Sequence, residues 1–292
     1  MTYGTPSAPY LATRCLQQFA EDEIKDFALA LETLKNNFYV DDALCGANTI
    51  EDALILQQEL NALLGRGRFH LRKFCVSHPS ILEAVPPDCR EIEVSIELES
   101  NEVIKTLGLL WHPLSDQFLI SKGTCVQKLR EPKNSPVSKR ISSIFAAIFD
   151  PLGLISPVVV HKIFLQQLWL HKLDWDDQLP SELLSQWRDL YLRLSQVNEI
   201  ASDALFLAKG QPTDIKLHGF CDSSEKAYGA CLYLCSVNQQ GEVKTKLLCS
   251  KSRVAPVKKT TLPSLNLCGA LLQAQLIQKT LPALNLKIDK IF

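Results

Sequence analysis

The sequence lacks an excess of charge of either sign. Its 292 residues contain 31 Lys and Arg residues against 32 Asp and Glu residues, and the formal net charge is -1. A domain that binds nucleic acid through its overall charge carries a clear basic excess. The composition excludes such a field over the whole chain, so any nucleic-acid site must be local.

A secretory signal and an uninterrupted apolar run are also missing. The first residues, Met1 to Gly4, have neither the basic nor the apolar region of a signal peptide. The longest apolar stretch, residues 141–165, contains Asp150, Pro151 and Pro157, which exclude a continuous membrane-spanning helix. We therefore expect an intracellular protein with no membrane partner.

The ten cysteines do not form the patterns of a disulfide framework or of a zinc site. They are scattered from Cys15 to Cys268, and the closest metal-like group (Cys75, His78 and Cys89) lacks paired C-x-x-C spacing. Internal repeats and low-complexity tracts are absent as well. With 46% hydrophobic residues, the chain is long and apolar enough for two or more folded domains.

Apolar residues in the first part of the chain recur at helical spacing. They predict mostly one amphipathic helix over residues 16–34, which leads into a strand-like stretch at Asn37–Cys45. A second helix is predicted around residues 53–63, with Thr49 at its N-terminal cap and Gly65 at its C-terminal cap. Helices thus dominate this region.

The later regions alternate between strand-like and helical patterns. Short strands are predicted at Phe69–Val76 and Val103–Trp111, and a helical region follows from Ser138 to Leu194, broken by proline near residues 150–153 and 179–180. Beyond residue 209 the pattern predicts three strands and one helix, at Ile215–Cys221, Gly229–Cys235, Val243–Ser250 and Leu265–Gln278. The expected core of this last region is Leu217, Leu232, Leu234, Leu247, Leu267 and Leu271.

Two adjacent carboxylates, Asp41 and Asp42, follow the apolar run Phe38-Tyr39-Val40. Such a pair is costly among strand residues unless a turn exposes it or a cation offsets its repulsion. One interpretation is an acidic hairpin tip, because Asp is a common turn residue. The other is a two-metal site for phosphoryl transfer, in which the carboxylates hold Mg²⁺.

Tyr39–Asp42 resembles the Y-x-D-D motif of reverse transcriptases, and its flanks resemble the Pol polyprotein of BEL/Pao LTR retrotransposons. In the flank after the hairpin, Arg68 departs from the family pattern because it separates Gly67 from Phe69. The similar segments follow the family's order and are Tyr3–Ala12, Gly67–Phe74, Thr106–Trp111, Ile148–Pro157 and Leu168–Asp176.

This resemblance implies RNA-directed DNA synthesis on a template-primer duplex. Asp41 and Asp42 would bind Mg²⁺, and Lys73 would protonate the leaving pyrophosphate. The residues that the resemblance places against nucleic acid are Tyr3, Gly4, Pro9, Leu109, Trp111, Lys139 and Arg140. The family's third metal carboxylate and its fingers subdomain precede the segment at Tyr3, so we expect weak Mg²⁺ binding and no primer extension by this chain alone.

The segment His218–Ala230 resembles the opening of RNase H, in which Asp222 would be the first metal-binding Asp. In the later family segment P-R-L-E-L, Ser264 stands where the Arg is expected and Asn266 where the Glu is expected. The family's next Asp would follow Phe292. An amide lacks the charge that two Mg²⁺ ions require, so the resemblance predicts an incomplete nuclease site.

A different class of function is an aspartic peptidase, which elements of this family also encode. Asp222-Ser223-Ser224 is near the D-[ST]-G signature, but Ser224 replaces the glycine that lets two chains approach closely.

Together these features predict an α/β (α+β) protein with three parts. A partial reverse-transcriptase palm is expected at residues 1–112, a helical thumb and connection at 113–208, and a truncated RNase H-like sheet with its helix at 209–292. The expected partners are an RNA/DNA duplex and the rest of the Pol polyprotein, in the cytoplasm or a virus-like particle. Besides a catalytically incomplete enzyme, a non-catalytic nucleic-acid-binding remnant and a fragment associated with the peptidase remain open.

Overall fold

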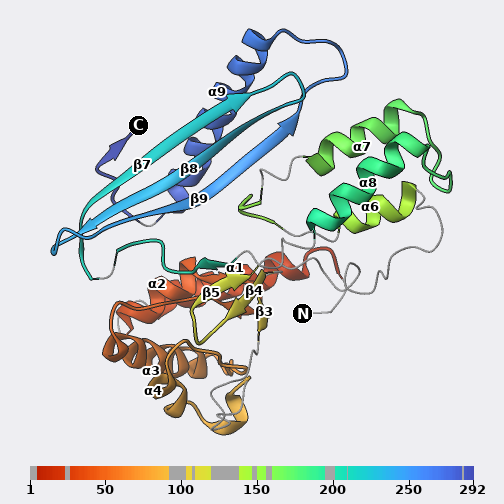
Figure 1. The fold of residues 1–292 in the computed structure, drawn as a ribbon. Helices are drawn as coiled ribbons and strands as arrows, with labels where there is room; N and C mark the ends of the chain where they lie inside the picture. The colour runs from red at the N-terminus through yellow and green to blue at the C-terminus, as the bar shows by residue number, and fades with distance from the viewer. Residues whose placement is uncertain are drawn as a thin grey trace. The chain divides into compact units, whose positions relative to one another are not determined.

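The structure is a computed structural model that describes residues 5–23, 27–91, 103–106, 109–119, 138–146, 150–155, 160–194, 201–208, 210–284 and 286–292. The chain divides into two compact units, Met1–Thr106 with His112–Ser115, and Leu107–Trp111 with Asp116–Phe292. Figure 1 shows their helices and strands, and the mixed α/β fold class is confirmed. No helix in the described part of the chain has the length and apolar character of a membrane span.

The first unit is built mainly from helices that bury one face each. Its elements are α1 (Ala8–Asp22), α2 (Ala28–Asn36), β1 (Phe38–Tyr39), β2 (Asp42–Ala43), α3 (Ile50–Arg66), α4 (Pro79–Glu83), the 3₁₀ helix η1 (Pro87–Cys89) and β3 (Ile104–Thr106). The buried core comes from α1, α2 and α3, and consists of Ala20, Ala30, Leu31, Leu34, Leu56, Leu60, Leu63 and Leu64. Leucines at helical spacing explain why α2 and α3 form against each other.

Several local predictions in this unit need correction. The expected single helix is two helices, α1 and α2. The Thr49 cap is confirmed because its side chain accepts the N–H of Asp52 at 3.1 Å, but the C-terminal cap is Gly67 and not Gly65. The predicted strand at Phe69–Val76 is wrong. In the described part of this segment the only β pairing is an isolated bridge between Phe74 and Arg90, because no neighbouring strand extends it.

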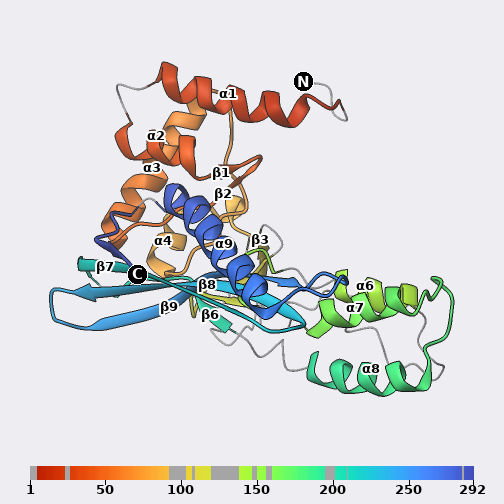
Figure 2. The ribbon, with the colours of Figure 1, turned by 90° about the horizontal axis from the view of Figure 1, so that it is seen from above.

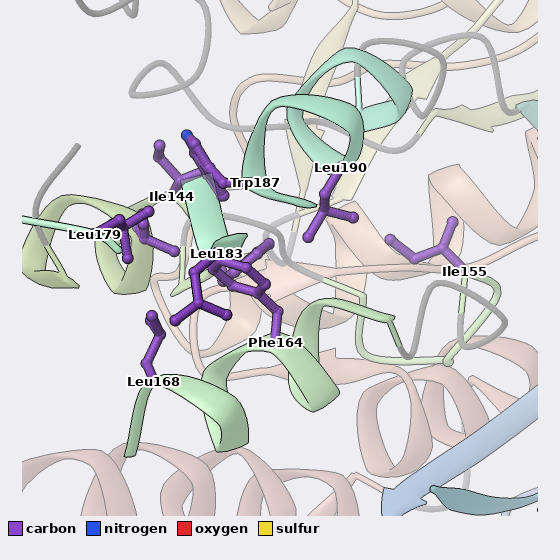
Figure 3. Close-up of a cluster of buried hydrophobic side chains, with 10 residues drawn as sticks. Ile144, Ile155, Phe164, Leu168, Leu179, Leu183, Trp187 and Leu190 are labelled. Atoms are coloured by element: carbon purple, nitrogen blue, oxygen red, sulfur yellow. The ribbon is translucent and has the colours of Figure 1, made fainter. Parts of the chain in front are cut away.

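Three helices of the second unit enclose a core of their own: α6 (Ser138–Ala146), α7 (Val160–Leu170) and α8 (Ser181–Leu194). The ring of Trp187 is packed in this core, 5.7 Å from the ring of Phe145 and 6.0 Å from that of Phe164, and Figure 3 shows Trp187 with its neighbours. Asp150 accepts the N–H groups of Leu154 and Ile155 and fixes the turn between α6 and α7. The predicted helical region and its proline breaks are confirmed.

The remaining part is a four-stranded sheet with a helix across one face. The order is β10-β7-β8-β9, with antiparallel β7 (Pro212–Ser223), β8 (Ala227–Asn238) and β9 (Val243–Val254) and with β10 (Lys290–Ile291) parallel to β7. Helix α9 (Leu262–Thr280) lies across β7 and β8 and ends in the 3₁₀ helix η4 (Leu281–Ala283) (Figures 1 and 2). The short strand β10 pairs with β7 and adds a fourth strand to the three that the sequence predicted.

The buried residues of this sheet confirm half of the predicted core. Leu217, Leu232 and Leu234 are fully buried. Leu267 and Leu271 are exposed instead, because α9 turns Leu265 and Leu272 toward the sheet. Because leucines lie on several sides of α9, the sequence alone does not show which face of this helix is buried.

Ion pairs connect a smaller set of strands to β9. These strands are β4 (Leu109–His112), β5 (Gln117–Leu119) and β6 (Ala201–Asp203), and β5 pairs antiparallel with β6. Asp203 forms ion pairs with Lys246 at 2.7 Å and with Lys244 at 3.5 Å, both in β9. The hydrogen bonds from Lys246 and Gln117 lower the pKa of Asp203 to about 2, so this carboxylate stays charged well into acid.

The three-helix group contacts the other end of β9. The backbone N–H of Ser250 donates to the carbonyl of Leu152 at 2.8 Å, and its hydroxyl donates to the carbonyl of Gly153. Lys162 of α7 donates to the hydroxyl of Ser252 at 3.3 Å, and Gln166 to the carbonyl of Ala255 at 2.8 Å. The turn before α7 and α7 itself thus contact this end of β9.

We predict that the three-helix group depends on Trp187 for its stability. Trp187 is 3% exposed and Trp169 is 78% exposed. Trp187→Ala should lower the free energy of unfolding by about 3–5 kcal/mol, because it leaves a cavity among aromatic rings. Trp169→Ala, the matched control, should change it by less than about 0.5 kcal/mol. Urea unfolding followed by circular dichroism measures both, and equal losses in the two variants would contradict the described packing.

Candidate functional site

Asp222 is an exposed carboxylate near the C-terminal end of β7. It pairs across the sheet with Gly229 of β8, which in turn pairs with Ser252 of β9. One carboxylate oxygen of Asp222, Oδ1, accepts the backbone N–H of Ser223 at 2.8 Å. The carboxylate therefore lies at the end of a long, well-paired strand and is accessible from solvent.

Helix α9 brings Asn266 to the same end of the sheet. The hydroxyl of Ser223 donates a hydrogen bond to the side-chain oxygen of Asn266. One turn later in α9, Gly269 is so close to β7 that an added Cβ would lie 3.5 Å from the carbonyl oxygen of Asp222. The structure therefore places Asn266 against Ser223, the residue next to Asp222. Because successive side chains of a strand alternate, the side chain of Asp222 lies on the face that carries Ser252, opposite α9.

Ser223 and Gly269 are parts of this site that the sequence reasoning missed. Glycine inside a helix costs about 1 kcal/mol relative to alanine, so a glycine at residue 269 of a predicted helix is a signal of close packing. Ser223 gave no comparable signal, because serine after a strand-end Asp is common in turns.

The donors at this site do not fit a pair of Mg²⁺ ions. They comprise one carboxylate and one neutral amide, whereas two close divalent ions need several carboxylates to offset their repulsion. The described residues contain no group of three or more His, Cys, Asp or Glu side chains that could hold a metal. Asp289 lies away from the Asp222 end of β7, where its Oδ2 accepts the N–H of Ile215 at 2.8 Å. Ser264, at the expected Arg position, contacts Thr261 at the start of α9.

Asp41 and Asp42 lie on a short hairpin, within the stretch Asn37–Cys45 that the sequence predicted to be strand-like. Tyr39 pairs with Asp42 across β1 and β2, so Val40 and Asp41 form a two-residue turn. Val40 has a φ of 59°, a left-handed conformation that is unfavourable for a β-branched residue. The turn leaves both carboxylates exposed to solvent.

Lys73 and Trp111 each contact a residue outside the predicted site. Lys73 forms an ion pair with Glu91 at 3.7 Å, not with Asp41 or Asp42. The indole N–H of Trp111, in β4, donates to Asp116 at 3.0 Å. The roles assigned to these two side chains stay predictions.

The other predicted contacts with nucleic acid are distributed over several elements. Pro9 lies in the exposed first turn of α1, and Leu109 is half-buried in β4. Lys139 and Arg140 lie in the first turn of α6, and their side chains are outside the described part of the chain, as are Tyr3 and Gly4.

Comparison with known families gives one match. A family model described as a Pao retrotransposon-like RNaseH-like domain matches residues 138–292. The matched part contains the three-helix group as well as the sheet and α9. No curated protein matches the chain.

Proposed function

Because the chain belongs to the family of Pao retrotransposon-like RNase H-like domains, we propose that it binds an RNA–DNA duplex within a retrotransposon Pol protein without cleaving it. The contact between Ser223 and Asn266 beside Asp222 supports this proposal most. By the resemblance to RNase H, a neutral amide then stands at the position where hydrolysis needs a second negative charge.

The groups at the site favour retention of the duplex over its hydrolysis. Asp222 by itself can attract a single hard cation, and Asn266 can add an uncharged oxygen ligand. Neither group supplies the charge that would hold two cations in place while a phosphodiester is attacked. Affinity for the duplex then comes from Lys and Arg side chains that contact phosphates, independently of base sequence.

We predict weak, salt-dependent binding of an RNA–DNA hybrid, with Lys139 and Arg140 at the start of α6 contributing. Each phosphate contact adds about 0.9 to the slope of log affinity against log salt. Reversing both charges (Lys139→Glu with Arg140→Glu) should therefore lower affinity and flatten that slope by nearly 2. Fluorescence anisotropy with a labelled hybrid over a salt series measures this.

The matched control is Lys172→Glu with Arg188→Glu, which changes the net charge equally at exposed positions of the same helical group. It should leave most of the affinity and the slope intact. If both double variants bind the hybrid like the unmodified chain, the prediction that Lys139 and Arg140 contribute to its affinity is contradicted. Cleavage of the hybrid by the unmodified chain, lost in Asp222→Asn, would contradict the proposal itself.

A second function is favoured by the strained turn at Val40. Left-handed φ values in β-branched residues persist where the surroundings impose them, and they cluster at functional sites. We propose that the hairpin Tyr39–Asp42 is the carboxylate-bearing turn of a reverse-transcriptase palm, as its resemblance to Y-x-D-D implies.

We predict that this hairpin binds a divalent cation weakly through its two exposed carboxylates. Mn²⁺ is a suitable probe, because it prefers the same oxygen ligands as Mg²⁺. Asp41→Asn with Asp42→Asn should remove one weak Mn²⁺ site in a titration followed by electron paramagnetic resonance. The control is Asp174→Asn with Asp176→Asn, another exposed pair of acidic residues. The same loss of Mn²⁺ binding in both double variants would show general charge attraction and would overturn the assignment.

A further inference from the structure

The strand β9 carries Lys251 and Arg253 on the same face of the sheet as α9. Cross-strand pairing aligns Ser223, Tyr228 and Arg253 in one row, and residues directly opposite each other share a face. Ser223 contacts Asn266 of α9, so this row is on the α9 side. Lys251 precedes Arg253 by two residues and therefore lies on that side too.

The alternate residues of β9 contact the three-helix group on the opposite face. Ser250 contacts Gly153, and Ser252 contacts Lys162. Ser252 is buried there, whereas Lys251 and Arg253 are exposed. One face of this end of β9 is used for packing, and the other presents two cations to solvent.

Lys226 adds a third cation beside them. Its carbonyl accepts the N–H of Ala255 at 2.9 Å, so the turn between β7 and β8 is held against the end of β9. The hydroxyl of Ser224 accepts the N–H groups of Lys226 and Ala227 and fixes that turn.

The charge of these three side chains is not neutralised within the described parts of the chain. Lys244 and Lys246, at the other end of the same strand, pair with Asp203. No ion pair of the described residues involves Lys226, Lys251 or Arg253. The acidic residues of the neighbouring turn are Asp222 and Glu225, both exposed.

We propose that Lys226, Lys251 and Arg253 form a binding site for the sugar–phosphate backbone of an RNA–DNA duplex, an inference that rests on the proposed function. Strands lie about 4.8 Å apart, so the backbone of Arg253 is about 10 Å from that of Ser223. A phosphate held by Arg253 would thus lie beside the candidate site, on the side of the sheet where Asn266 is. The guanidinium can bind a phosphate through two parallel hydrogen bonds, and the lysines add point charges.

The test uses the full chain and a short, fluorescently labelled RNA–DNA hybrid. Lys251→Glu with Arg253→Glu should weaken binding at least about tenfold at low salt and flatten the salt dependence by nearly 2, as expected for two lost phosphate contacts. Lys251→Arg with Arg253→Lys should keep the salt dependence. The charge-matched control, Lys172→Glu with Arg188→Glu, should bind more than threefold tighter than the Lys251/Arg253 charge-reversal variant.

A second measurement needs no variant and covers the case in which charge reversal unfolds the domain. Acetylation of lysines, read by mass spectrometry, should be slowed at Lys226 and Lys251 when the hybrid is bound, while Lys172 reacts as before. Equal affinity of the Lys251/Arg253 and Lys172/Arg188 charge-reversal variants for the hybrid would contradict this site. Hybrid binding that leaves Lys226 and Lys251 unprotected from acetylation would contradict it too. Neither result would contradict the proposed function. Complete absence of hybrid binding by the unmodified chain would overturn the proposed function together with this site.

Discussion

The close packing of α9 against the end of β7 determines the geometry of the candidate site. At Gly269 an added Cβ would be in ordinary van der Waals contact with β7, 3.5 Å from the carbonyl oxygen of Asp222 and 3.8 Å from the Cβ of Cys221. One turn earlier, the same approach puts Asn266 in contact with Ser223.

The chemistry of the site then depends on a single difference of charge. Asn266 has nearly the shape of an Asp side chain but none of its negative charge. Asp289 holds the backbone of Ile215. A site with one carboxylate repels a phosphate backbone less than a full set of acidic ligands would when no cations are bound, which favours duplex binding without hydrolysis.

The basic side chains of β9 form two groups, one that makes ion pairs within the fold and one that is exposed to solvent. Lys244 and Lys246 neutralise Asp203 and hold a neighbouring strand, and Lys251 and Arg253 are left exposed beyond the contacts of the three-helix group. This division explains how a chain with a formal net charge of -1 can still present a local basic surface. A net charge summed over the sequence cannot reveal it, because it depends on which lysines are paired.

The sequence predicted the strands and helices of the region around Asp222 well, because alternation in β7 and β8 is regular and prolines mark the ends of the helices. It could not predict which leucines of α9 are buried, since Leu265 and Leu272 differ from Leu267 and Leu271 only in the rotation of the helix. Nor did it predict β10, whose two residues are ordered by pairing with the distant strand β7.

For the site itself, motif resemblance identified Asp222 and Asn266, and the fold places Asn266 against Ser223, the residue next to Asp222. The contact through Ser223 could be found only from the structure, because it depends on how far α9 reaches along the end of β7. Lys73, assigned by the same kind of resemblance, pairs with Glu91, and its proposed role stays untested.

A cation titration can measure whether the missing charge at residue 266 limits cation binding. Asn266→Glu should raise the affinity of the full chain for Mn²⁺ at least about tenfold, since a second carboxylate within about 4 Å of a divalent ion adds roughly 2 kcal/mol or more of attraction even in a water-like environment. Gln275→Glu adds the same charge at an exposed position of α9 away from Asn266 and should leave that affinity nearly unchanged. If Asn266→Glu binds Mn²⁺ no better than Gln275→Glu, residue 266 is not part of a cation site.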